Sequence, residues 1–203
     1  MLLKIHPENP SQRQILRACE VVRKGGIIVF PTDSVYALGC DIFTHKAVER
    51  IARLKGIRPE KADFSFIFSD LSQVSDYARL FDNRIFKLMK SHLPGPFTFI
   101  LHARNNVPKI FQSSKKTLGV RIPNNKIPLE LVRNLGNPIM TTSIHDEDEL
   151  LEYTTDPDLI YEKWKGKVDV IINGGFGNNV PSTVIDCTQP EPVIVRQGIG
   201  IIE

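Results

Sequence analysis

The chain has 203 residues, of which 41% are apolar, 24% charged and 8% aromatic. This composition is typical of a globular protein and excludes collagen-like, low-complexity and largely disordered chains. No apolar run exceeds residues 27–30, whereas a membrane span needs about 18 residues, and residues 1–7 lack the apolar core of a signal peptide. We therefore expect a cytoplasmic protein with no membrane partner, folded as one domain over residues 1–203.

The charges nearly balance, because 26 Lys and Arg oppose 23 Asp and Glu for a formal net charge of +3. This excess is too small to indicate a nucleic-acid-binding protein by itself. Basic residues gather in stretches 50–61 and 109–121, and acidic ones in 146–149. Each stretch is either part of a face for phosphate-bearing ligands or a solvated surface without a partner.

Metal and disulfide patterns are missing from the sequence. The three cysteines, Cys19, Cys40 and Cys187, are odd in number and far apart, which predicts reduced thiols in the core. The five histidines are scattered, so we expect no metal site in the chain. A P-loop and an early G-x-G-x-x-G are also absent, so a nucleotide would have to bind in another way.

Apolar periodicity predicts the order of the elements. A helix follows Ser11, which forms a capping-box pattern with Gln14, and it ends at Gly25 and Gly26. Residues 27–30 form a buried strand, and another helix runs from Thr44 to about Lys55. The remaining expected elements are strands at 64–68, 97–101, 118–122, 139–142, 168–172, 183–186 and 193–196, and helices at 71–79, 83–92, 128–135 and 157–165.

These elements do not alternate strictly between strand and helix. Neighbouring strands within 97–122 and within 183–196 are joined without a predicted helix. Such an order favours a mixed sheet over a purely parallel one. We therefore predict an α/β fold with a twisted mixed sheet flanked by helices.

Two polar segments stand next to predicted strands. Residues 31–39 (PTDSVYALG) follow the buried strand at 27–30, at a position where open sheets usually present ligand-binding groups. The alternative is a turn in which the Thr, Asp and Ser side chains cap local backbone donors. Residues 94–98 (PGPFT) either turn backbone groups toward a ligand or form a tight corner.

Two arginines end apolar strands. Arg121 lies in 119–123 (GVRIP) and Arg196 in 193–198 (VIVRQG). A guanidinium can bind a carboxylate or phosphate through paired hydrogen bonds, so two such arginines point to an anion site. Snorkelling and structural ion pairing are the competing explanations.

Taken together, five segments resemble the YrdC-like family of threonylcarbamoyl-adenylate synthases. The similarity spans nearly the whole chain, and the stretch 6–26, with Ala37 where the family usually has glycine, is similar to the YciO branch. The segments are specific as a set, although each is weak alone. They are 31–39, the 55–59 stretch KGIRP, 94–98, 120–123 and 182–186.

The resemblance implies one twisted mixed-sheet domain with a large concave basic surface. The implied reaction joins L-threonine, bicarbonate and ATP into threonylcarbamoyl-adenylate, releases pyrophosphate and feeds the modification of an adenosine in tRNA. Magnesium would be bound to the phosphates of ATP. The same surface was first regarded in this family as a site for double-stranded RNA, so RNA, including tRNA, is a further implied partner.

The resemblance also implies roles for individual residues. Lys55 and Arg58 would face the phosphates and serve as the catalytic residues, while Thr32, Ser34 and Tyr36 would line the threonine and carbamate end. The implied remainder of the site is Arg121 and Ser182 for the substrate, and Thr98, Ser143 and Arg196 for the nucleotide.

Two positions depart from the family's pattern. Arg58 stands one residue later than the usual Lys-x-Arg-Pro arginine, with Ile57 in its place, and His145 replaces the usual asparagine after Ser143. Three functions therefore stay open: the synthase, a double-stranded RNA or tRNA-binding protein with weak or altered synthase activity, and a related activity on another amine. His145 itself is either a catalytic base or an ion-pair partner of the neighbouring acids.

Overall fold

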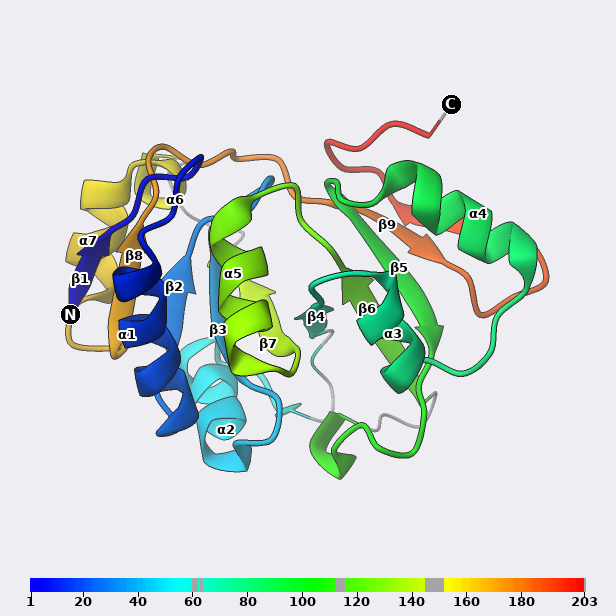
Figure 1. The fold of residues 1–203 in the computed structure, drawn as a ribbon, viewed down its shortest axis with the longest axis horizontal. Coiled ribbons are helices and arrows are strands. Elements are labelled where there is room, and N and C mark those ends of the chain that lie inside the picture. Colours follow the sequence, from blue (N-terminus) through cyan, green and yellow to red (C-terminus); the bar gives the residue numbers. More distant parts are fainter. Residues whose placement is uncertain (60–61, 63, 112–115, 145–151, 203) are drawn as a thin grey trace.

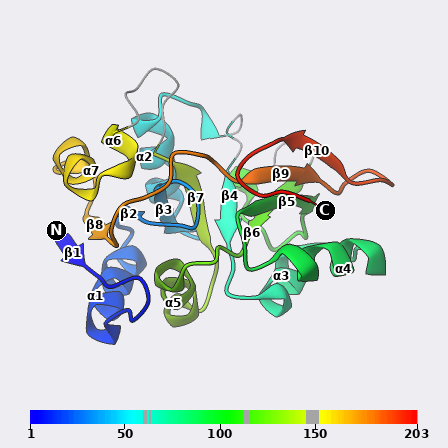
Figure 2. The same cartoon turned by 90° about the horizontal axis from the view of Figure 1, so that it is seen from above.

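The computed structural model describes residues 1–59, 62, 64–111, 116–144 and 152–202. Ten strands of the described residues form one mixed sheet, and helices pack along it (Figure 1 and Figure 2). The strands are β1 Leu2–Lys4, β2 Ile28–Phe30, β3 Ala37–Asp41, β4 Ser65–Ile67, β5 Phe97–His102, β6 Thr117–Arg121, β7 Ile139–Ser143, β8 Val170–Asn173, β9 Thr183–Asp186 and β10 Val193–Arg196.

Every helix that the sequence predicts is present in the structure. None of the helices in the described part of the chain has the length and apolar character needed to cross a bilayer. The α-helices are α1 Gln12–Arg23, α2 His45–Leu54, α3 Leu71–Tyr77, α4 Asn83–His92, α5 Lys126–Leu135, α6 Glu152–Thr155 and α7 Pro157–Trp164, and a 3₁₀ helix spans Lys109–Phe111.

The strand order across the sheet is β1-β8-β2-β3-β7-β4-β6-β5-β9-β10. Four neighbouring pairs are parallel, namely β1/β8, β8/β2, β4/β6 and β5/β9, and the other neighbours are antiparallel. The mixed sheet is thus confirmed. Two pairs of strands were predicted to be joined without a helix, and both pairs, β5/β6 and β9/β10, are antiparallel neighbours. The connection from β5 to β6 does contain the short 3₁₀ helix.

Alternating side chains of the central strands enter two hydrophobic clusters. Val29 and Leu38 join a cluster with α2, whereas Phe30 and Ala37 join one with α1 and α5. Because successive strand residues point to opposite faces, these clusters lie on opposite sides of β2 and β3. Figure 2 shows the same division, with α1 and α5 on one side of the sheet and α2, α6 and α7 on the other.

The cysteines are free thiols, as predicted. Cys19 and Cys40 are buried and Cys187 is half-buried. Burial raises the pKa of Cys19 to about 11 and that of Cys187 to about 12. These thiols therefore stay protonated at neutral pH and behave as small apolar groups.

Strand β3 is the main element that the sequence pattern missed. Its residues Ala37–Asp41 include no β-branched or aromatic side chain, so strand propensity is low. Pairing with β2 and β7 on both edges nevertheless makes the segment a buried strand. Gly39 is needed there, since a Cβ atom would lie 2.7 Å from the ring of Phe30.

Three smaller differences concern β1, α6 and the start of α1. The short elements β1 and α6 were not predicted, because three or four residues carry too little periodicity to detect. Ser11 is the N-cap of α1, but its side chain makes no capping hydrogen bond. The side chain of Gln14 instead accepts a hydrogen bond from Arg17, so the predicted capping box does not form.

Candidate functional site

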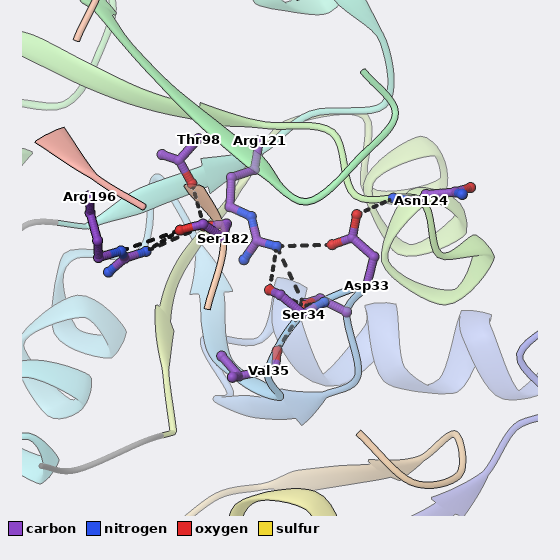
Figure 3. Close-up of polar contacts among 9 residues, drawn as sticks. Asp33, Ser34, Val35, Thr98, Arg121, Asn124, Ser182 and Arg196 are labelled. Carbon is purple, nitrogen blue, oxygen red and sulfur yellow. Dashed lines mark hydrogen bonds and ion pairs between the residues drawn. The ribbon is translucent and has the colours of Figure 1, made fainter. Parts of the chain in front are cut away.

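Arg121, the last residue of β6, holds the loop between β2 and β3. Its side chain is 7% exposed, and its Nη2 donates to Asp33 Oδ1 at 3.0 Å and to Ser34 Oγ at 2.9 Å. Figure 3 shows these bonds on one edge of the guanidinium. The polar segment after β2 and the arginine that ends β6 therefore form one buried cluster.

The loop itself is stabilised by short-range side-chain contacts. Thr32 Oγ1 donates to the carbonyl of Val35 at 2.7 Å and accepts from the backbone N–H of Ser34 at 3.1 Å. Asp33 Oδ2 accepts from the backbone N–H of Asn124 at 2.8 Å, just before α5. The segment is thus both a capped turn and part of the polar cluster, so the two alternatives are not exclusive.

Burial dominates the electrostatics of this pair. It raises the pKa of Asp33, and the charge of Arg121 opposes that rise. Burial also lowers the pKa of Arg121, while Asp33 opposes the change and the charge of Arg196 adds to it. An arginine keeps its charge in proteins, so the cluster contains a buried cation whose Nε has no hydrogen-bond partner among the described residues.

A second polar group lies across β5, β9 and β10. Thr98 Oγ1 and Ser182 Oγ are 2.8 Å apart, and Arg196 Nη2 donates to the carbonyl of Ser182 at 2.8 Å. Figure 3 shows these contacts, and the sheet explains them because β9 lies between β5 and β10. The charge of Arg196 lowers the pKa of Arg121, whereas the ion pair with Asp33 compensates the charge of Arg121 itself.

A cavity of about 520 Å³ opens beside the first group. Its described lining is mostly hydroxyl and amide side chains, with one aromatic ring and one carboxylate. The lining residues are Thr32, Asp33, Ser34, Thr155, Phe176, Gly177, Asn178 and Asn179.

Tyr36 lies beneath the connection between β8 and β9, which forms one wall of this cavity. Its hydroxyl donates to the carbonyl of Gly175 at 2.6 Å and accepts from the N–H of Gly174 at 3.1 Å. Burial raises the pKa of Tyr36 to about 12, so the phenol remains a donor at neutral pH. Tyr36 therefore supports the wall from behind, and a direct contact with substrate stays a prediction.

The corner at residues 94–96 uses its backbone groups internally. Gly95 N–H donates to the carbonyl of Ile122 at 2.9 Å, and the carbonyl of Pro96 accepts from Thr183 at 3.0 Å. These bonds tie the corner to the segment after β6 and to the start of β9. Of the two alternatives predicted for residues 94–98, the tight corner accounts for these backbone hydrogen bonds. The corner leads into β5, where Thr98 lies beside Ser182.

The other predicted residues come from different elements. Lys55 is the half-buried C-cap of α2 and Arg58 is exposed three residues later, so both come from the segment after α2 rather than from the strands that carry the arginines. Ser143 ends β7 and pairs with Ala37 of β3. His145 and the acidic stretch 146–149 lie outside the described residues.

The two basic stretches are only partly described. Lys61 and Lys115 fall outside the described residues. Arg50 forms an ion pair with Asp169 at 2.7 Å, which links α2 to the residue before β8. A concave basic surface therefore stays a prediction.

Sequence reasoning missed the cavity wall formed by Phe176, Asn178 and Asn179. These residues follow β8 in a stretch rich in glycine, which by itself indicates only a turn. The sequence did contain a weak indication of this wall, because Phe176 is an aromatic residue in a stretch of glycine and asparagine that has no other apolar side chain.

The mixed sheet with helices packed along it defines an α/β protein, and two of its strands end in arginines. A family model described as "Telomere recombination", covering Sua5, YciO and YrdC, matches residues 20–198. The chain therefore belongs to the Sua5/YciO/YrdC family. This membership confirms the resemblance predicted from the five sequence segments.

Individual relatives place the chain more closely. The uncharacterized protein YciO of Escherichia coli K12 is 45% identical over 98% of this chain and 96% of its own length. The crystal structure of E. coli YciO superposes with a TM-score of 0.91 over 99% of this chain and 97% of that one, at 44% identity. The predicted similarity to the YciO branch is thus confirmed.

A more distant relative carries a named activity. The threonylcarbamoyl-AMP synthase of Pyrococcus abyssi is 31% identical over 94% of this chain and 56% of its own length. The structure of P. abyssi Sua5 complexed with L-threonine has a TM-score of 0.87 at 29% identity, covering 98% of this chain and 57% of that one. The present chain thus spans little more than half of that protein.

Proposed function

We propose that this protein forms threonylcarbamoyl-adenylate from L-threonine, bicarbonate and ATP, releases pyrophosphate, and thereby supplies the threonylcarbamoylation of tRNA. The observation that carries the proposal is the buried Arg121, whose partners Asp33 and Ser34 line a polar cavity. Membership in a family that includes a threonylcarbamoyl-AMP synthase supports it.

Arg121 is suited to hold the carboxylate of L-threonine. Asp33 and Ser34 occupy its Nη2 and its Nε is buried, so Nη1 would be the donor toward a ligand. A hydrogen bond between a guanidinium and a carboxylate is short and strong because both groups are charged. Thr32 and Ser34 then lie at the amino and carbamate end of the substrate.

The chemical step needs cations around the α-phosphate. The threonine amine and bicarbonate first form a carbamate with loss of water. A carbamate oxygen then attacks the α-phosphorus of ATP, the bond from that phosphorus to the bridging oxygen breaks, and pyrophosphate leaves. Arg196, Lys55 and Arg58 would neutralise the developing charge. Thr98 and Ser143 would orient the nucleotide, and Ser182 the amino-acid substrate.

Magnesium, as a phosphate-bound ion, stays a prediction. Among the described residues, no group of three or more His, Cys, Asp and Glu side chains could hold a metal. Asp33 lines the cavity, but Arg121 and Asn124 occupy its two oxygens. The described side chains therefore do not provide a resident metal site, and the steps above do not depend on one.

Product analysis by mass spectrometry tests the proposal. Purified protein is incubated with ATP, magnesium, bicarbonate and L-threonine, beside a mixture without threonine. We expect threonylcarbamoyl-adenylate only in the complete mixture. Its absence from a folded protein that still binds ATP would contradict the proposal and favour another amine as substrate.

Arg121→Lys sharpens the test because it keeps the charge and removes the planar fork. We expect turnover to fall by about 100-fold or more, the effect of losing a well-placed donor. Arg133→Ala is the matched control, since Arg133 is exposed on α5 and paired with Glu130. Equal turnover in the Arg121 variant and the control would remove Arg121 from the site.

RNA binding is a separate prediction that the contacts described above do not favour or exclude. Binding of tRNA through phosphate contacts must weaken as the salt concentration rises, because the release of counterions from the RNA then contributes less free energy. A filter-binding titration at several salt concentrations checks this. Affinity for RNA that does not depend on salt would contradict the prediction.

A further inference from the structure

We infer that Phe176 is a specificity-determining residue that contacts the apolar part of the amino-acid substrate's side chain. The inference rests on the proposed function. Phe176 lies in the connection between β8 and β9, and its side chain is 79% exposed while lining the cavity beside Thr32 and Ser34. The connection crosses from one half of the sheet to the other (Figure 1).

The backbone around Phe176 is firmly held. Besides the two bonds to Tyr36, the N–H of Gly177 donates to the carbonyl of Thr155 at 2.8 Å, and that of Asn178 donates to the carbonyl of Ser34 at 3.1 Å. A Cβ atom at Gly177 would lie 2.7 Å from the Tyr36 ring. The connection is therefore fixed along the cavity wall, and its close approach to the Tyr36 ring requires glycine at residue 177.

This support leaves an aromatic ring in solvent on a rigid backbone. Exposing the ring contributes nothing to the core, and a held aromatic side chain loses little conformational entropy when a ligand covers it. Large exposed apolar groups beside a polar cavity are typical of ligand-contact positions. Phe176 is the one described lining residue with a large apolar side chain.

The charges of the lining indicate which end of the substrate Phe176 meets. The described lining contains no Lys or Arg, and its carboxylate is already paired with Arg121. Phosphates require cations, so the triphosphate belongs nearer Arg196. The cavity, in which Thr32 and Ser34 serve the amino and carbamate end, then receives the amino acid and not the triphosphate. A ring beside the amides of Asn178 and Asn179 suits a side chain with one methyl and one hydroxyl.

Binding of L-threonine and L-serine to Phe176→Ala tests the inference, because the two amino acids differ by one methyl group. One methyl group in an apolar contact changes affinity by about 10-fold or more. By calorimetry we expect the variant to bind L-threonine about tenfold more weakly and L-serine almost unchanged, so the threonine preference falls. Phe176→Tyr, which keeps the ring, should restore the preference.

Phe43→Ala is the matched control, since Phe43 is 58% exposed between β3 and α2 and does not line the cavity. It should leave both affinities unchanged. A threonine-to-serine ratio in Phe176→Ala equal to that of the wild type would overturn the inference, as would a loss of ATP affinity in place of threonine affinity. A wild-type protein that binds no L-threonine would overturn the proposed function, and the inference with it.

Discussion

The two strand-ending arginines have the same sequence signature and different surroundings. Arg121 is almost fully buried and donates from Nη2 to Asp33 and Ser34. Arg196 is exposed, and its described bonds go to the backbone carbonyl and hydroxyl of Ser182. The first arginine is therefore part of the folded framework as well as of the candidate site, whereas the second contributes no buried charge to the fold.

This difference teaches that an arginine ending an apolar strand has no single meaning. Structural ion pairing and anion binding were competing explanations; for Arg121 the structure shows the ion pair with Asp33, and anion binding stays a prediction. For Arg196 the structure shows hydrogen bonds to one residue and no carboxylate partner among the described residues.

The largest expected effect comes from breaking the buried pair. Asp33→Ala leaves the charge of Arg121 buried without its partner, which costs about 3 to 5 kcal/mol of unfolding free energy. Urea unfolding followed by circular dichroism measures it. Glu162→Ala, which breaks the exposed pair with Lys165, should cost far less, because solvent screens a surface ion pair. Equal losses in the two variants would show that the burial of the Asp33 pair has no energetic consequence.

Arg196→Ala should separate activity from stability. We expect adenylate formation to fall by about 100-fold to 1000-fold, because a cation facing the phosphates is lost. The unfolding free energy should fall by no more than about 1.5 kcal/mol, the value of ordinary hydrogen bonds. Turnover assays and urea unfolding on the same preparation measure both. A stability loss as large as that of Asp33→Ala would make the two arginines equivalent.

Tyr36→Phe tests the support of the cavity wall, which lies on the Arg121 side of the comparison. The substitution removes the hydroxyl that bonds Gly174 and Gly175, and it should lower the unfolding free energy by about 1 to 3 kcal/mol. Amide hydrogen exchange should then increase in the β8–β9 connection. Unchanged exchange there would mean that the hydroxyl does not hold the wall.

The smallest effect concerns Asp70, an exposed counterpart to the buried carboxylate of Asp33. Asp70 is the N-cap of α3, and the N–H of Gln73 is the main cause that lowers its pKa below 3.8. Because the folded pKa is lowered, its contribution is present above pH 3.8 and is lost as the pH falls through the folded pKa. Asp70→Ala should therefore cost about 1 kcal/mol at about pH 7 and less in stronger acid, as measured by urea unfolding. A pH-independent cost would contradict this.

Most of the fold follows from local sequence patterns. The helices and most strands are visible as apolar periodicity bounded by glycine, proline and capping residues. Strand β3 shows the limit, because Ala37–Asp41 has low strand propensity and becomes a strand only through pairing with β2 and β7. Pairing between distant segments is a tertiary effect that no local window contains.

For the site, the sequence by itself predicted which residues would bear the chemistry: the hydroxyls and carboxylate after β2, and the arginines that end β6 and β10. The order of the five sequence segments also predicted the family, and the match of the family model confirms it. The tertiary structure decided which groups meet. It paired Asp33 with Arg121, placed Tyr36 behind the cavity wall and turned Phe176 into solvent. The physical reason is that burial and hydrogen-bond partners depend on contacts between residues far apart in the chain, and those contacts determine whether a charged or aromatic side chain supports the fold or faces a ligand.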